Sequence, residues 1–213
     1  MWQPRSVRAS LEATVRHFDR WAHTYERDPS SRVVGIAQRE TLAALRLRAD
    51  DRFLDVGCGT GAAVREAAKS AAQATGLDLS PKMVERAREL AHGAGNVDFV
   101  EGSSAALPFD DGAFTALLCT TSFHHYPEPR QALLEMGRVL APGGRLALGD
   151  ASGDLFAMRL VDRFARAVQR GHVGFYRFAE LAEWLRAAGF ERIERVRRWG
   201  GIYAIVTAVK AAP

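Results

Sequence analysis

The segment Leu54–Gly61, LDVGCGTG, places glycine at every second position, Gly57, Gly59 and Gly61, directly after a short apolar run. Glycine adopts a positive φ without strain and lets a ligand lie against bare backbone, because it has no side chain. A helical pattern opens at Ala62. A glycine-rich loop between a strand and a helix is where an α/β sheet binds a nucleotide-like ligand.

Two features near this loop favour a ligand over a simple turn. The free N–H groups at the start of the following helix favour a negative group such as a carboxylate. The next apolar run ends at Asp78, where an acidic side chain can accept hydrogen bonds from both hydroxyls of a ribose. Gly57, Gly59 and Ala62 also match the G-x-G-x-x-G/A pattern of nicotinamide-binding folds. The loop alone therefore leaves two cofactors open.

From residue 51 onward, short apolar runs alternate with helical patterns. Alternation of this kind specifies a parallel sheet that is covered by helices on both faces. The expected strands are 52–56, 74–79, 97–100, 114–121 and 144–150, and the expected helices between them are 62–72, 80–92 and 128–140.

The two ends of the chain differ from this middle part. Residues 7–27 place apolar side chains at steps of three and four, which indicates an amphipathic helix. Asp28-Pro29 interrupts the pattern, and a second helical pattern follows at 30–47. We expect residues 1–50 to form a helical cap or lid, and residues 51–213 to form the ligand-binding domain.

The C-terminal part contains helical patterns at 154–170 and 177–188, followed by strand candidates at 192–199 and 202–210. Gly200-Gly201 joins these strands, and a joint this short cannot hold a crossover helix, so the pair must be antiparallel. The sequence therefore predicts a doubly wound, Rossmann-like α/β sheet of seven strands, mostly parallel, with an antiparallel C-terminal strand.

Composition narrows the class of protein. Of the 213 residues, 47% are hydrophobic and 25% charged, which suits one globular domain with a small appendage. No apolar run approaches the roughly 18 residues of a membrane span, and no signal-peptide core is visible, so we expect a cytoplasmic protein.

Cys58 and Cys119 belong to no metal-ligand spacing, so no metal site is expected. Acidic residues are mixed with the basic ones, so the net charge of +4 does not favour a nucleic acid partner.

Further segments distinguish between the two cofactors. GLDLSPKMVERARE at 76–89, and the stretch 100–148 with its LPF, HH and VLAPGGRL segments, follow the glycine loop in a fixed order. A nicotinamide enzyme has no reason to carry them in this order. Over roughly residues 15–211 the chain resembles the class I S-adenosylmethionine-dependent methyltransferases, especially the small-molecule, quinone-biosynthesis-like branch known as methyltransferase type 11. The resemblance implies S-adenosylmethionine as the cofactor.

The resemblance also implies which residues hold the methionine part of the cofactor. Asp55 supports the loop and reaches the amino group through water, while Gly57, Gly59 and Gly61 make room. Cys58, in the same loop, is expected to contact the cofactor. Thr120, at the end of the fourth strand, is expected near the sulfonium with its neighbour Thr121. Tyr25 resembles an N-terminal tyrosine that closes over the carboxylate.

For the adenosine part, the resemblance places Asp78 on the ribose hydroxyls and Leu79 and Met83 beside the adenine. Ser103 and Ser104 occupy the place where the family carries an acid that accepts a hydrogen bond from the adenine amino group. A serine hydroxyl can accept this bond too, but the contact is weaker without the charge. Ser103 is therefore expected to reduce adenine affinity.

His124 and His125 follow the fourth strand and are the candidate general bases, since a base accelerates methyl transfer when the nucleophile must lose a proton. We expect one of the two to face the cleft. The alternative interpretation is structural: one member of the pair holds the loop by hydrogen bonds.

We therefore expect an enzyme that transfers a methyl group from S-adenosylmethionine to a small organic acceptor, by O- or C-methylation of a quinone, phenol or secondary metabolite, as a monomer or homodimer. Two alternatives keep the fold: a non-catalytic partner or regulator that binds an adenosyl ligand, and an RNA methyltransferase. The segment TTSFHHY at 120–126 lacks the Asn- or Asp-Pro-Pro-aromatic motif common in base N-methyltransferases, which argues against the second.

Overall fold

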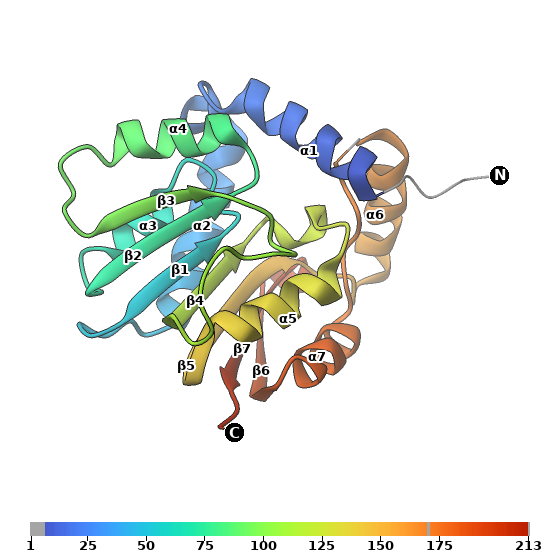
Figure 1. Cartoon of the computed structure of the whole chain (residues 1–213). Helices are drawn as coiled ribbons and strands as arrows, with labels where there is room; N and C mark the ends of the chain where they lie inside the picture. Colours follow the sequence, from blue (N-terminus) through green and yellow to red (C-terminus); the bar gives the residue numbers. More distant parts are fainter. Residues whose placement is uncertain (1–6, 170, 213) are drawn as a thin grey trace.

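The computed structural model describes residues 7–169 and 171–212. One seven-stranded sheet forms the centre of the molecule, with strand order β3-β2-β1-β4-β5-β7-β6 (Figure 1). The strands are β1 (Arg52–Val56), β2 (Gln73–Asp78), β3 (Val97–Glu101), β4 (Phe114–Thr120), β5 (Leu140–Ala151), β6 (Phe190–Arg198) and β7 (Tyr203–Lys210). The helices are α1 (Val7–Trp21), α2 (Pro29–Ala44), α3 (Ala62–Ala67), α4 (Pro81–Leu90), α5 (Pro129–Val139), α6 (Phe156–Val168) and α7 (Phe178–Ala187), with short 3-10 turns η1 (Tyr25–Arg27), η2 (Phe123–His125) and η3 (Trp199–Gly201).

The sheet confirms the predicted architecture. β1 to β5 pair in parallel, whereas β7 runs antiparallel to both of its neighbours, β5 and β6. The order reverses between β1, which continues to β2, and β4, which lies on the other side of β1. In open α/β sheets, ligands bind outside the carboxyl ends of the strands at such a reversal.

Side chains alternate between two apolar cores, one on each face of the sheet. Leu54 of β1 and Leu117 of β4 pack with α5 and α7, while Phe53 and Leu118 pack with α2, α3 and α4. Because successive strand residues point to opposite faces, Asp55 of β1 and Thr120 of β4 belong to the second face. Two polar side chains thus share the α2 and α3 side at the carboxyl ends of neighbouring strands.

The first predicted helix, 7–27, is shorter in the structure. α1 ends at Trp21, and the chain turns through η1 before α2 begins at Pro29. The Trp21 indole N–H donates to Asp28 at 3.2 Å, and the Tyr25 ring packs against Trp21 with centroids 4.7 Å apart. This local cluster bends the chain before the proline, so helical periodicity alone placed the end of the helix too late.

The two N-terminal helices are attached differently. α2 packs on the sheet, and its buried Thr41 hydroxyl lies 3.2 Å from the Tyr203 hydroxyl of β7. α1 runs past the start of α4 (Figure 1), where Ser80 donates to Asp19 at 2.6 Å. Among the residues that the structure describes, no helix combines the length and apolar character needed to cross a membrane.

Candidate active site

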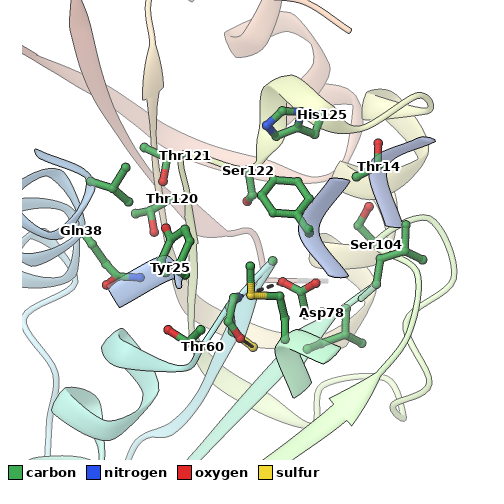
Figure 2. Close-up of a pocket in the computed structure, with 18 of the residues that line it drawn as sticks. Thr14, Tyr25, Gln38, Thr60, Asp78, Ser104, Thr120, Thr121, Ser122 and His125 are labelled. Atoms are coloured by element: carbon green, nitrogen blue, oxygen red, sulfur yellow. Dashed lines mark hydrogen bonds between the residues drawn. The ribbon is translucent and has the colours of Figure 1, made fainter. Parts of the chain in front are cut away.

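A cavity lies at the carboxyl ends of β1, β2 and β4, beneath α1, η1 and the start of α2. Ten of the twelve residues predicted for the cofactor line it, the exceptions being Asp55 and Gly61. The ten are Tyr25, Gly57, Cys58, Gly59, Asp78, Leu79, Met83, Ser103, Ser104 and Thr120. Figure 2 shows Asp78 and Thr60 in the lower part of the view, Ser104 and Thr14 at the right, and His125 at the top.

The three loop glycines all have positive φ, but their surroundings differ. A Cβ on Gly57 would lie 2.5 Å from the Ser122 hydroxyl, and one on Gly61 would lie 2.5 Å from the Phe99 ring. A Cβ on Gly59, at φ +53°, would meet nothing within 4 Å. Gly57 and Gly61 therefore allow close packing within the protein, whereas Gly59 borders open space that a ligand can occupy.

Asp78 ends β2 and is held by two backbone N–H groups. Gly59 donates to Oδ2 at 2.8 Å and Ser80 donates to Oδ1 at 2.9 Å. Burial raises the pKa of this carboxyl despite the two hydrogen bonds. Ser80 also caps α4 by accepting from the Met83 N–H at 3.1 Å, which positions Leu79 and Met83 beside Asp78 in the cavity wall. The group is oriented before any ligand arrives.

Asp55 and Thr120 carry buried polar groups that make no hydrogen bond to any other residue described by the structure. Asp55 is fully buried, and neither carboxyl oxygen makes a hydrogen bond to a described residue. The Thr120 hydroxyl oxygen is likewise buried without a partner. Burial, reinforced by the nearby charge of Asp78, raises the pKa of Asp55 to about 8. Orphaned buried polar groups are rare in native structures, and two on one face beside a cavity fit a polar, cationic part of a ligand.

Tyr25 reaches the cavity from η1, between the two N-terminal helices. Its backbone carbonyl accepts a hydrogen bond from the Ser31 hydroxyl. Burial raises the pKa of the phenol to about 12, with smaller contributions from Asp78 and Asp55. Tyr25 is thus a neutral hydrogen-bond donor close to both carboxyl groups.

Ser103 and Ser104 line the cavity after β3. The Ser103 hydroxyl accepts from the Ala105 N–H at 3.2 Å, and Ser103 forms an isolated bridge with Ala106. Its oxygen therefore already stabilises its own turn, which leaves less capacity for a ligand than a carboxylate would have.

The two adjacent histidines have different environments. His124 Nδ1 lies 2.8 Å from the Asp150 carboxylate, which also accepts from the His124 backbone N–H at 3.0 Å, and His124 is not among the residues lining the cavity. His125 does line it, with its ring edge-on to Phe18 at 5.2 Å. The structure thus distinguishes His125, which lines the cavity, from His124, which does not, whereas the sequence alone could not distinguish them.

The tautomer of His125 follows from its partner. Nδ1 lies 2.8 Å from the carbonyl oxygen of Gly171, and a carbonyl only accepts, so Nδ1 carries the proton and Nε2 presents a lone pair. Burial, and then the neighbouring His124, lower the pKa of His125 to about 3. His125 is therefore neutral throughout the physiological range.

Sequence reasoning missed several lining residues on the N-terminal helices. Leu11, Thr14 and Phe18 come from α1, and Arg32 and Gln38 from α2. Their helical spacing was visible in the sequence, but an apolar helix face packs against a core and lines a cavity with the same period. Helical spacing therefore does not distinguish a helix face that lines a cavity from one that packs against a core.

Comparison with known proteins identifies the family of this chain. A methyltransferase domain family matches residues 54–148. The YcgJ protein of Bacillus subtilis has the same fold, with a TM-score of 0.77 at 21% identity over 84% of this chain and 100% of that chain. A demethylmenaquinone methyltransferase of Clavibacter sepedonicus is 31% identical to this chain, over 92% of it and 89% of the relative. The chain belongs to the class I S-adenosylmethionine-dependent methyltransferases.

Within that family the chain is an enzyme that methylates small-molecule acceptors. It is also similar to the 27-O-demethylrifamycin SV methyltransferase of Amycolatopsis mediterranei, with 36% identity over 79% of this chain and 65% of that protein. The predicted family, fold class and type of reaction are thereby confirmed.

Proposed function

We propose that the cavity binds S-adenosylmethionine and that the enzyme methylates an acidic hydroxyl of a flat, apolar acceptor, with His125 receiving the proton. The observation that carries the proposal is the Nε2 lone pair of His125, which the Gly171 carbonyl leaves free on the wall of the cavity. The relative from Amycolatopsis, which is named for an O-demethylated compound, supports transfer to oxygen.

The residues present fit the cofactor. Asp78, fixed by the Gly59 and Ser80 N–H groups, is suited to accept from ribose hydroxyls. Asp55 and Thr120, both orphaned and buried, suit the cationic amino group. Gly59 leaves space for the ligand against the backbone. When bound, S-adenosylmethionine supplies an electrophilic methyl group on a sulfonium.

The low pKa of His125 limits the acceptor. Burial lowers the pKa of His125, so its neutral imidazole accepts a hydrogen bond but is a weak base, and it favours the more acidic of two hydroxyl acceptors. A phenol or hydroquinone meets this condition better than an aliphatic alcohol. Leu11, Phe18 and Val34 line the cavity with apolar surface, which suits a planar ring and holds it in position for reaction.

The sequence predicts a helical cap or lid over residues 1–50, and we also propose that only part of this segment moves. The Thr41–Tyr203 hydrogen bond and the burial of Leu45 attach α2 to the sheet. The attachment of α1 includes the Asp19–Ser80 hydrogen bond at the rim of the cofactor site. This difference supports a cap made of α1 and η1, which carries Tyr25 over the cofactor.

The test is methyl transfer to matched acceptor pairs. Purified enzyme is incubated with S-adenosylmethionine and either a phenol, its methyl ether, or an aliphatic alcohol of similar size, and S-adenosylhomocysteine is quantified. We expect turnover of the phenol alone, with the methyl group on oxygen. His125→Gln should lower kcat by about 10²–10⁴-fold with little change in cofactor affinity, while the exposed His92→Gln serves as the matched control. Methylation at carbon, or equal turnover of the alcohol, would contradict the proposed acceptor.

A further inference from the structure

α6 exposes a broad apolar surface that nothing in the described chain covers. Its large side chains are more than half exposed at Phe156 (67%), Leu160 (56%), Phe164 (68%) and Val168 (55%), and Val161 is exposed to 50%. The first four recur at every fourth residue and so lie along one side of the helix. Single exposed apolar residues are ordinary, but a contiguous apolar surface marks an interaction site. We call these five residues the α6 stripe.

The opposite side of α6 attaches the helix to the protein through few groups. Ala165 and Asp162 are buried, and Asp162 accepts from the Phe175 N–H at 2.8 Å and lies 2.7 Å from His172 Nε2. Within residues 7–169 and 171–212, α6 makes no extensive contact with another helix or strand. The helix therefore projects from the domain, at the right of Figure 1.

Charge on α6 is arranged on one flank of the stripe. Arg159, Arg163 and Arg166 are exposed and, at 100° per residue, cluster on the side next to Phe156. Arg166 pairs with Asp162 at 2.8 Å. Asp162 is the one acidic residue between Phe156 and Val168, and it points inward. The exposed surface of α6 is thus apolar or basic throughout, on a chain whose net charge is +4.

We propose that α6 is an interfacial helix that binds the surface of an anionic phospholipid membrane, with the stripe in the acyl boundary and the arginines on lipid phosphates. A helix with a wide apolar face flanked by arginines lies in the plane of such an interface. A projecting, convex helix suits a deformable lipid surface. A second copy of this chain packed antiparallel through the stripe would bring the two arginine flanks to the same edge of the interface, where their charges repel.

The proposal goes beyond the proposed function and does not depend on it. It has one geometric consequence for the site, however. α6 ends at Val168, three residues before Gly171, whose carbonyl accepts from His125. A membrane bound to α6 would therefore lie near the end of the cavity that holds His125.

The test is flotation of the full chain with vesicles of phosphatidylcholine alone or of phosphatidylcholine mixed with phosphatidylglycerol. We expect binding to the mixed vesicles that weakens at high salt. Phe156→Ser/Phe164→Ser should lower partitioning by about 100-fold, tenfold for each phenylalanine. Arg159→Gln/Arg163→Gln should lower it by about 30-fold on the anionic vesicles only. Leu134→Ser, at an exposed apolar position on α5 (47%), is the control and should bind as the wild type does.

Thermal unfolding and S-adenosylhomocysteine affinity, measured on every variant, verify that the fold is intact. The proposal is overturned if the wild type floats with neither vesicle, or if both double variants bind as the wild type does. It is equally overturned if Leu134→Ser loses as much binding as the phenylalanine variant. A dimer in sedimentation that Phe156→Ser/Phe164→Ser converts to monomer, without vesicle binding, would assign the stripe to a second copy.

Discussion

Replacing Asp55 by asparagine is expected to stabilise the ligand-free protein at neutral pH while weakening its binding of S-adenosylmethionine. The carboxyl group is fully buried without a hydrogen-bond partner in the described chain, and its pKa is raised from 3.8 to about 8. In the unfolded chain the same group ionises at its ordinary pKa. Between pH 3.8 and about pH 8 the Asp55 carboxyl is therefore ionised in the unfolded chain but protonated in the folded protein.

The sign and size of the effect follow from this difference. With a raised folded pKa, the full stability is present below about pH 3.8 and is lost as pH rises towards 8. The loss is about 1.4 kcal/mol per pH unit and reaches about 4 kcal/mol at pH 7. Asparagine has nearly the same shape and no proton to release, so Asp55→Asn removes the loss. The expected gain is about 4 kcal/mol at pH 7 and less than about 1 kcal/mol at pH 4.

Urea unfolding at pH 4, 5.5 and 7 measures this gain, and calorimetry with S-adenosylmethionine measures binding. Losing one hydrogen bond to a charged group should weaken the affinity by about 10–100-fold. Asp51→Asn is the matched control. Although burial opposes it, hydrogen bonds from Arg48 and Thr115 and the Arg145 guanidinium lower the pKa of Asp51, so this variant should lose stability at pH 7. A pH-independent effect of Asp55→Asn, or unchanged affinity, would refute the reasoning.

Four further predictions address the site. The pKa of His125 is about 3 in the folded protein and 6.5 in the unfolded chain. Acidification to pH 5 therefore protonates only the unfolded state and removes about 2 kcal/mol of stability. Urea unfolding of His125→Gln should show a smaller loss of stability between pH 7 and pH 5 than the wild type does. Asp78→Ala should abolish S-adenosylmethionine binding in calorimetry, and an unchanged affinity would disprove the ribose placement. Ser103→Asp should tighten S-adenosylmethionine by about 5–10-fold through a charge-assisted hydrogen bond to the adenine amino group, so a weaker complex would contradict that role. Gly59→Ala should keep the fold at a cost of about 1–2 kcal/mol but lose cofactor binding. Gly61→Ala should unfold more easily, because its Cβ would lie 2.5 Å from the Phe99 ring. Equal stability of the two variants in thermal unfolding would contradict this account of the packing.

The parts of the site that were predictable are those encoded by local backbone chemistry. Alternate glycines after a strand, and Asp78 at the end of the next strand, require only that β1 and β2 be neighbours in a parallel sheet, and they are. The joint at Gly200-Gly201 likewise predicted the antiparallel pair, because it is too short for a crossover.

The remaining features depend on contacts between distant segments. The sequence presents His124 and His125 as equivalent, and only the carbonyl of Gly171 and the carboxylate of Asp150 distinguish them. Gly57, Gly59 and Gly61 also look alike in the sequence, but Phe99 of β3 and Ser122 after β4 determine which of them borders open space.

The sequence by itself therefore determined the order and type of the elements, the class I methyltransferase family, and the loops that line the cavity. These rest on periodicity, turn chemistry and residue identity within short segments. The tertiary structure alone decided which histidine presents a lone pair to the cavity. It also decided that, among the described residues, nothing hydrogen-bonds the buried Asp55 carboxyl and nothing covers the apolar face of α6. Burial and proton position are set by groups far apart in the chain, and a local pattern carries no information about which of its faces the rest of the molecule will cover.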